Sequence, residues 1–351
     1  MWRRAGVLLL SLGLAVSAAG CSLRAAGASA PRSAGVTGVG APASAEVPPP
    51  AARVVPSPPP SAPSSPPPSP PYAVGRATFT FTEPAGNGHA ARTLPTVLRY
   101  PATATGPLRS AAPFPLIVFS QGYDMPAESY ANLLAAWAAD GYVVADPTFP
   151  DTAPDWPGGP NEHDVVNHPR DVSFLIGQLL GMAEAPGGPL TGLIDPHHVG
   201  LAGHSDGGEV TLAVADNSCC RDPRVSAAVV LSGSELPAFG PGYFGGPPTP
   251  LLVAQGNADA LNSPACSEYA YDHAPAPKYY LDLLGGTHTG PYLGSGRQQT
   301  MVAGVTADFF NTYLRGEEGA KTRLAGDATG SGVATITGAA TVASTGRCPG
   351  Y

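Results

Sequence analysis

From residue 72 onward, short apolar runs alternate with longer segments whose apolar residues recur at helical spacing. The apolar runs predict strands over 115–120, 142–147, 198–205, 225–233, 250–257 and 277–286. The periodic segments predict helices over 128–141, 170–181, 207–215 and 296–316. Two further runs, 76–84 and 94–101, predict a pair of antiparallel strands at one edge. This alternation predicts an α/β fold with a mostly parallel central sheet, helices on both faces, and active groups at the carboxyl ends of the strands.

The first 21 residues, MWRRAGVLLLSLGLAVSAAGC, are typical of an export signal, because two arginines precede an apolar stretch that ends in small residues. Ala18, Ala19 and Gly20 before Cys21 resemble the lipobox of bacterial lipoproteins, although that motif usually has Leu, Val or Ile where this chain has Ala18. Two outcomes stay open. Acylation of Cys21 would anchor the protein to the outer face of the membrane, and ordinary cleavage would release it; both predict an extracytoplasmic location.

Residues 22–72 lack periodicity, and residues 48–71 contain 13 prolines in 24 positions. Such a segment buries too little apolar surface to offset the entropy of ordering, so it predicts a disordered tether. Beyond it, residues 73–316 are predicted to form the catalytic domain. Residues 317–351 are rich in Gly, Ala and Thr and predict a tail that either adds a late strand within 333–342 or stays loose.

The net charge of the chain argues against a nucleic-acid partner. The chain has 18 Lys and Arg against 26 Asp and Glu, a formal net charge of −8. It therefore lacks the basic surface that binds a run of phosphates, and we expect no nucleic-acid partner.

The sequence Gly203-His204-Ser205-Asp206-Gly207 lies where a predicted strand meets a predicted helix. This is the place of a nucleophile elbow, in which glycines flank a serine because side chains there would collide across a strained turn. A helix that begins at Asp206 also directs free backbone N–H groups toward developing negative charge. The motif predicts that Ser205 is a nucleophile.

A serine nucleophile needs a base, and the base needs an acid that holds its tautomer. Asp259 follows the strand 250–257, and His288 follows the strand 277–286. In a parallel sheet both would lie at the same edge as Ser205. The spacing therefore predicts a Ser205–His288–Asp259 triad, with a simple turn as the alternative for Asp259 and an exposed loop residue as the alternative for His288.

Residues 76–315 resemble the α/β-hydrolase superfamily, within it the dienelactone-hydrolase-like group that includes cutinase-like polyesterases, platelet-activating-factor acetylhydrolases and chlorophyllases. The resemblance is carried by LPTVLRYP, PFPLIVFSQGYDMPAESYANLLAAWAADGYVVADP, VGLAGHSDGGEVTL, QGNADALNSP and LGGTHTGP. It implies that Ser205 is the nucleophile, His288 the general base and acid, and Asp259 the orienting carboxylate. It also implies an oxyanion hole made by the backbone N–H groups of Tyr123 and Asp206.

The expected function is an exported serine esterase that acts on small or lipid-like carboxylic esters through an acyl-enzyme, without metal or organic cofactor. A lipase or phospholipid-acyl hydrolase, or a catalytically idle binding lipoprotein, stays open. Dienelactone hydrolases use cysteine where Ser205 stands, and the tryptophan of polyesterases is absent after 225–233. Two segments rich in Pro and Gly, 151–168 and 235–249, are expected to roof a cleft.

Several other residues are given lesser roles. Asp206 either faces the cleft and disfavours anionic esters or favours the positive end of its helix. His204 is expected to pack beneath the turn, and His197 and His198 to lie in a surface loop. His163 and His168 have a spacing that does not suit a metal site. After export Cys219, Cys220, Cys266 and Cys348 remain, and a bond from Cys266 to either of the first two is not expected, whereas the path of the tail to Cys348 is left open.

Overall fold

The computed structural model describes residues 69–86, 88–343 and 348. The predicted signal at 1–21, with Cys21, and the tether up to residue 68 lie outside these residues. The last tether residue, Tyr72, is already attached to the domain, because its N–H donates to the carbonyl of Ala139 and its ring packs edge-on against Phe114. The first strand begins one residue later, at Ala73.

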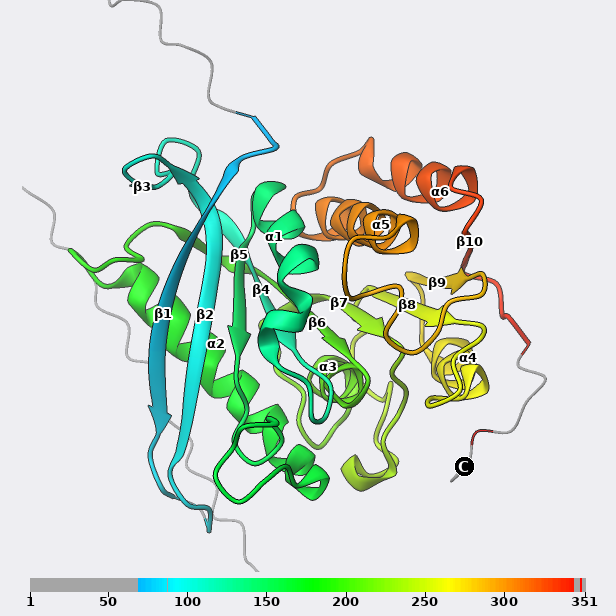
Figure 1. Cartoon of the computed structure of the whole chain (residues 1–351), viewed down its shortest axis with the longest axis horizontal. Helices are drawn as coiled ribbons and strands as arrows, with labels where there is room; N and C mark the ends of the chain where they lie inside the picture. Colours follow the sequence, from blue (N-terminus) through cyan, green and yellow to red (C-terminus); the bar gives the residue numbers. More distant parts are fainter. Residues whose placement is uncertain (1–68, 87, 344–347, 349–351) are drawn as a thin grey trace, which may run out of the picture. The chain divides into compact units, whose positions relative to one another are not determined.

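In the described part of the chain, ten strands form a single sheet in the order β1-β2-β5-β4-β6-β7-β8-β9-β10, with β3 paired to β2 (Figure 1). Their bounds are β1 Ala73–Glu83, β2 Arg92–Thr103, β3 Gly106–Pro107, β4 Phe114–Ser120, β5 Val143–Pro147, β6 Ile194–His204, β7 Val225–Leu231, β8 Leu251–Gly256, β9 Lys278–Leu283 and β10 Ala334–Gly338. The strands from β5 to β9 in this order are parallel, whereas β2 is antiparallel to both of its long neighbours and β10 is antiparallel to β9.

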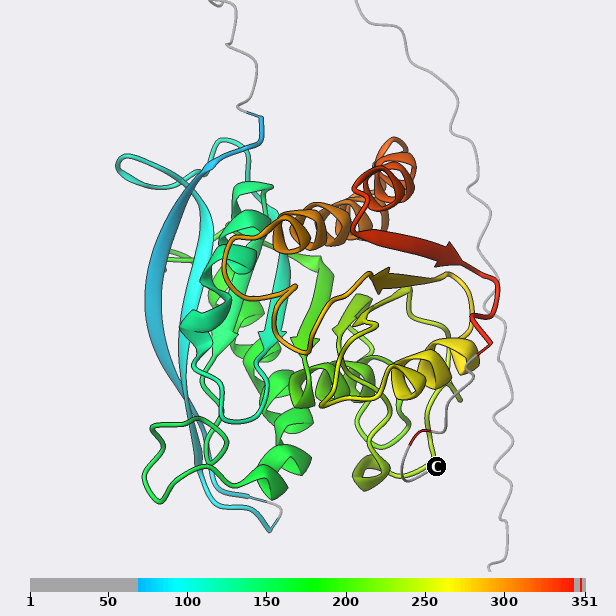
Figure 2. The ribbon, with the colours of Figure 1, turned by 45° about the vertical axis from the view of Figure 1, so that its right-hand side comes forward.

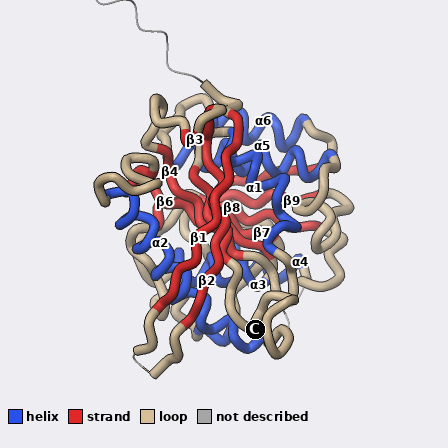
Figure 3. Tube along the Cα trace, turned by 60° about the vertical axis from the view of Figure 1, so that its left-hand side comes forward, coloured by secondary structure: helices blue, strands red, loops and turns tan. Residues whose placement is uncertain are grey.

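Helices cover both faces of this sheet, and Figure 3 shows the strands running between them. Their bounds are α1 Ala131–Ala139, α2 His168–Glu184, α3 Asp206–Asp216, α4 Pro264–His273, α5 Arg297–Leu314 and α6 Ala320–Gly330. Short 3₁₀ helices occupy Ala127–Tyr130, Glu162–Asn167 and Pro237–Phe239. The predicted fold class, a mostly parallel sheet with helices on both faces, is confirmed.

Alternation along the strands divides the apolar core into two layers. In β4, Leu116 and Val118 pack with α2, α3 and α4, while Ile117 and Phe119 pack with α1, α5 and α6. Successive side chains of a strand point to opposite faces, so a strand buried on both sides must be apolar throughout. All seven residues of β4 are buried, which is why this run was recognisable in the sequence.

The chain beyond residue 316 continues the domain. Helix α6 was not predicted; it packs on α5 and buries Leu324 and Ala328 in the core layer of α1 and α5. The late strand exists as β10, which pairs with β9 at the sheet edge (Figure 2). Helix α4 was also missed, since its sequence carries little apolar periodicity. Within the described part of the chain, no helix has the length and apolar character needed to cross a bilayer.

Candidate active site

Ser205 lies on a sharp turn between β6, which ends at His204, and α3, which begins at Asp206. Its φ of 56° is in the left-handed region that non-glycine residues rarely adopt. The turn is possible because two neighbours are glycines. A Cβ at Gly203 would lie 2.0 Å from the carbonyl oxygen of Gly207, and a Cβ at Gly207 would lie 2.0 Å from that of Ser120. The local geometry is that of a nucleophile elbow.

The structure brings Ser205, His288 and Asp259 together in one hydrogen-bonded line. His288 Nε2 lies 3.0 Å from Ser205 Oγ, and His288 Nδ1 lies 2.8 Å from Asp259 Oδ2. The carboxylate can only accept, so Nδ1 carries the proton and Nε2 is free to accept from the serine hydroxyl. Asp259 follows β8 and His288 follows β9, so the parallel order of these strands delivers both side chains to the edge where β6 ends.

Asp259 is held as a carboxylate by the turn that follows β8. Its Oδ1 accepts from the backbone N–H groups of Leu261 and Asn262, each at 2.9 Å, and its Oδ2 accepts from Gln255 at 3.1 Å. Burial acts to raise the pKa of Asp259, but the hydrogen bonds from His288, Asn262 and Leu261 outweigh it and lower that pKa. Asp259 therefore both stabilises the turn after β8 and binds His288, so the two roles considered for it do not exclude each other.

Tyr123 stands in the loop after β4, close to the elbow. A Cβ at the preceding Gly122 would lie 3.2 Å from the Cβ of Ser205, closer than most side chains approach one another, so glycine favours this close approach. Among the described residues, neither the N–H of Tyr123 nor that of Asp206 donates to an atom of another residue. The phenol of Tyr123 donates to the carbonyl of Pro160 at 3.2 Å, so the segment 151–167 lies over this loop.

The carboxyl group of Asp206 lies beside the elbow without an ion-pair partner among the described residues. Burial, and then the nearby charge of Glu162, raise the pKa of Asp206 to about 6, against the opposing influence of its own backbone N–H and of His288. Its Oδ2 is buried without a hydrogen-bond partner in the described structure. Glu209, one turn later in α3, has its pKa raised by burial and by Asp206. The surroundings of Ser205 are therefore acidic and poorly solvated.

The comparisons with known proteins can now be set beside this geometry. The model of the chlorophyllase family matches residues 85–232, a range that includes Tyr123 and Ser205 but ends before Asp259 and His288. The matched family belongs to the α/β-hydrolase-like group, in agreement with the mostly parallel sheet of this chain. The match points to an ester hydrolase, and no curated protein matches the chain at a significant level.

His163 and His168, which flank Asp164, do not form a joint site. His168 is buried and stacks on Phe149 with ring centroids 4.2 Å apart, while His163 is exposed, so the two do not converge. Asp164 between them is bound by Arg92. His197 and His198 lie within the first residues of β6 rather than in a loop before it, a small correction to the prediction. No group of three metal-ligating side chains occurs in the described ranges.

The cysteines pair as Cys219–Cys220 and Cys266–Cys348. Cys266 does not bond to Cys219 or Cys220, in agreement with their expected places at opposite ends of the sheet. The partner of Cys266 could not be read from the sequence, because no local pattern links it to a cysteine in the tail. The second disulfide joins positions that are 82 residues apart.

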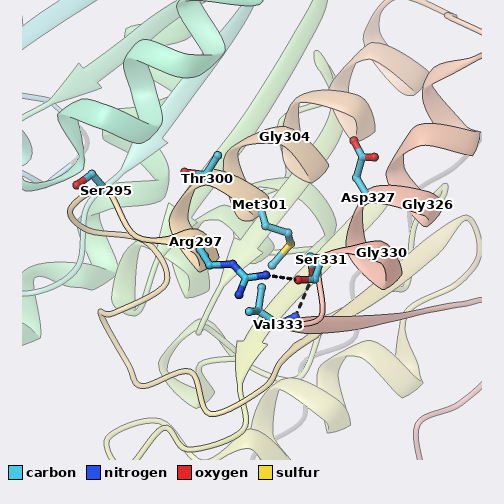
Figure 4. Close-up of a pocket in the computed structure, with 10 residues that line it drawn as sticks. All are labelled: Ser295, Arg297, Thr300, Met301, Gly304, Gly326, Asp327, Gly330, Ser331 and Val333. Carbon is cyan, nitrogen blue, oxygen red and sulfur yellow. Dashed lines mark hydrogen bonds between the residues drawn. The ribbon is translucent and has the colours of Figure 1, made fainter.

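A small cavity of about 260 Å³ lies beside α3 and the turn that follows Asp259. It is lined by Glu209, Ser234, Glu235, Leu236, Pro237, Leu261, Asn262, Ser263, Cys266 and Cys348. Residues 235–237 line this cavity, whereas Ser205, Asp259 and His288 do not, so the expected roof over the site stays a prediction. A larger groove of about 660 Å³ lies between α5, α6 and the approach to β10, where Arg297 donates to the carbonyl of Ser331 (Figure 4). None of Ser205, Asp259 and His288 lines that groove.

Sequence analysis missed one residue of this site, Tyr130. It is fully buried at the end of the 3₁₀ helix Ala127–Tyr130, just before α1, and its hydroxyl lies 2.9 Å from Nδ1 of His204. A tyrosine among the apolar residues of a helix gives no sign of such a contact, because its partner is 74 positions away. His204 is buried beneath the turn, as expected, but it also bonds to the backbone of His288.

Proposed function

We propose that the protein is an exported serine esterase that hydrolyses carboxylic esters through an acyl-enzyme. The observation that carries this proposal is the unbroken line of hydrogen bonds from Ser205 through His288 to Asp259. The match to the chlorophyllase family over the segment that contains the elbow supports the same reaction class. The idle-binder alternative gains no support, since no member of the line is missing.

In the first half of the reaction, Ser205 Oγ attacks the ester carbonyl as His288 Nε2 takes the hydroxyl proton. The tetrahedral oxygen carries the negative charge and is held by the N–H groups of Tyr123 and Asp206, neither of which donates to another residue within the described ranges. Asp259 keeps the proton on His288 Nδ1 and stabilises the imidazolium. When the intermediate collapses, His288 gives its proton to the departing alcohol.

In the second half, water enters in place of the alcohol. His288 Nε2 takes a proton from this water, whose oxygen attacks the acyl carbon, and the same two N–H groups hold the new oxyanion. Collapse breaks the bond to Ser205 Oγ, which regains its proton from His288, and the carboxylic acid leaves. Every step uses groups of the chain and water, and the reaction needs no cofactor.

The test is covalent labelling by a fluorophosphonate probe. The wild-type protein should be modified at Ser205, and Ser205→Ala should abolish labelling. His288→Ala should slow it by about 10³- to 10⁴-fold, since the serine then lacks its base. Ser226→Ala is the matched control, because Ser226 is a half-buried serine at the start of β7 and should keep the wild-type rate.

Folded wild-type protein that stays unlabelled where a reference esterase reacts would refute the esterase and favour a binding lipoprotein. For a labelled protein, a series of p-nitrophenyl esters of rising chain length separates an esterase from a lipase. A preference for short acyl chains supports the proposal as stated. Activity that rises with chain length, or toward phospholipid, would replace it with the lipase alternative.

We further propose that the protein acts outside the cytoplasm, held to the membrane by acyl groups on Cys21 and the tether at 22–72. One acyl chain gives only marginal attachment, so the proposal assumes the several chains of a lipoprotein. Wild-type protein should then fractionate with membranes, and Cys21→Ser should release it or leave the precursor uncleaved. Mature wild-type protein found entirely in the medium would support plain secretion.

A further inference from the structure

A second line of hydrogen bonds runs beneath the proposed active site. The N–H of Gly122 donates to Tyr130 Oη at 3.2 Å, Tyr130 Oη lies 2.9 Å from His204 Nδ1, and His204 Nε2 lies 2.8 Å from the carbonyl oxygen of His288. We call these four residues the Tyr130 chain. Tyr130 is 0% exposed and His204 is 1% exposed, so water does not compete for these bonds.

The direction of every bond in the Tyr130 chain follows from its ends. The carbonyl of His288 can only accept, so His204 Nε2 carries a proton and donates it. Burial, and then the charge of His288, lower the pKa of His204 to about 3, so the ring is neutral and its Nδ1 is an acceptor. Tyr130 must therefore donate to Nδ1, while its oxygen accepts from Gly122.

This chain joins the two loops that the proposed reaction uses. Gly122 immediately precedes Tyr123, whose N–H is one proposed oxyanion donor. The other end binds the backbone of His288, the proposed base. His204 itself is the residue before Ser205 in the chain, and its ring centroid lies 4.7 Å from that of His288. One buried path thus connects the donor, the nucleophile and the base.

We propose that Tyr130 and His204 are positioning residues. They fix the loop after β4, which contains Gly122 and Tyr123, relative to the loop after β9, which contains His288. The inference rests on the proposed esterase function and adds two residues that the triad does not contain. Neither side chain forms a hydrogen bond with Ser205 Oγ or His288 Nε2; they act through the backbone of Gly122 and His288 and through the packing of the His204 ring on that of His288. Small displacements of catalytic groups cost much rate, because attack needs near-contact geometry; a shift of about 1 Å can cost about 100-fold.

Tyr130→Phe is the first test, because it keeps the ring that packs on Phe119 and removes only the hydroxyl. It leaves the N–H of Gly122 and Nδ1 of His204 without partners. We expect kcat for a p-nitrophenyl ester and the fluorophosphonate labelling rate to fall by about 10- to 100-fold, while KM changes less than about threefold.

Tyr142→Phe is the matched control. Tyr142 is equally buried, and its hydroxyl donates to Asn311 Oδ1 at 2.5 Å, in a contact that includes none of the proposed catalytic residues. Both variants lose one buried hydroxyl, so both should lose thermal stability. Only Tyr130→Phe should lose rate in the folded fraction.

Substitutions at His204 provide a second test that does not depend on the tyrosine. In His204→Gln the amide nitrogen can reach the place of Nε2 and still donate to the carbonyl of His288. In His204→Asn the shorter amide reaches only the place of Nδ1, so that donor is lost. We expect the Gln variant to keep several-fold more kcat than the Asn variant.

The outcomes separate this inference from the proposed function. If wild-type protein is not labelled at Ser205, the esterase proposal fails first. If wild-type protein is labelled and folded Tyr130→Phe reacts at the rate of Tyr142→Phe, the Tyr130 chain has no positioning role. Equal kcat in the Gln and Asn variants of His204 would also overturn it.

Discussion

The Tyr130 chain differs from a second buried cluster in the kind of contact that holds it together: hydrogen bonds in the first, ion pairs in the second. The second cluster consists of Arg92 at the start of β2, Asp164 in the segment over Tyr123, and Asp171 in α2; we call it the Arg92 cluster. Arg92 Nε and Nη2 bind Asp171 at 2.7–3.0 Å, and Nη1 and Nη2 bind Asp164 at 3.1 and 2.6 Å. The exposed fractions of these residues are 8%, 8% and 0%. The Tyr130 chain contains no carboxyl or guanidinium group, whereas the Arg92 cluster combines one guanidinium with two carboxyl groups.

The difference affects what each cluster can do. Uncharged side chains such as those of Tyr130 and His204 cost little to bury when they are hydrogen-bonded. Each of their polar atoms has a defined partner, so the chain fixes geometry while it contributes modestly to the free energy of unfolding. A buried ion cluster pays a large desolvation cost, and its loss is severe mainly because the remaining charges stay buried without partners. We therefore expect the Arg92 cluster to govern whether the segment 151–167 folds, and the Tyr130 chain to govern how fast the site reacts.

Arg92→Met should give the largest effect on stability. It leaves the carboxylates of Asp164 and Asp171 buried without their cation, and we expect a loss of about 3–5 kcal/mol in the free energy of unfolding. Urea denaturation at pH 7 measures this. In the fraction that remains folded, the labelling rate at Ser205 should fall less than in Tyr130→Phe.

Arg109→Met is the control, because Arg109 is an exposed arginine that donates to the carbonyls of Pro189 and Thr191. Its unfolding free energy should change by less than about 1 kcal/mol. The contrast between the clusters would collapse if Arg92→Met proved as mild as Arg109→Met.

The features that the sequence predicts are local, whereas both clusters depend on contacts between residues far apart in the chain. Local patterns sufficed for β4, for the glycines around Ser205 and for the placing of Asp259 and His288 after their strands, because each depends on a few adjacent residues. Arg92 and Asp171 are 79 positions apart, and Tyr130 and His204 are 74 apart, so no window of sequence shows either contact. Helix α6 was missed for a related reason: only packing on α5 tells its alanines and glycines from those of a loose tail.

Asp206 interacts electrostatically with Glu162, in the segment 151–167, and with His288 of the Tyr130 chain. A folded-state pKa of about 6, raised from 3.8 by burial first, means that the fold disfavours the ionised carboxyl. The resulting loss of stability is absent below about pH 4, develops as the pH rises toward 6, and is complete above it.

Asp206→Asn should therefore stabilise the protein by about 1–2 kcal/mol at pH 7.5 and have little effect at pH 4. Urea denaturation at the two pH values checks this. Lower stability of the variant at pH 7.5 would instead assign the carboxylate to the positive end of α3. If the side chain faces the ester, the variant should also narrow the ratio of kcat/KM between neutral and anionic substrates.

The smallest expected effect is the coupling between the two clusters. No residue belongs to both, and among the described residues no hydrogen bond links a side chain of the Arg92 cluster to Tyr130 or His204. Mutations that share no partner usually add within about 0.5 kcal/mol. In a cycle of Arg92→Met, Tyr130→Phe and the double variant, the unfolding free energies should add within that margin, and the labelling rate of the double variant should equal the product of the single effects. A coupling above about 1 kcal/mol would mean that the segment 151–167 and the loop of Gly122 and Tyr123 shift together, through the contact of Tyr123 with Pro160. The division between a stabilising and a positioning cluster would then be wrong.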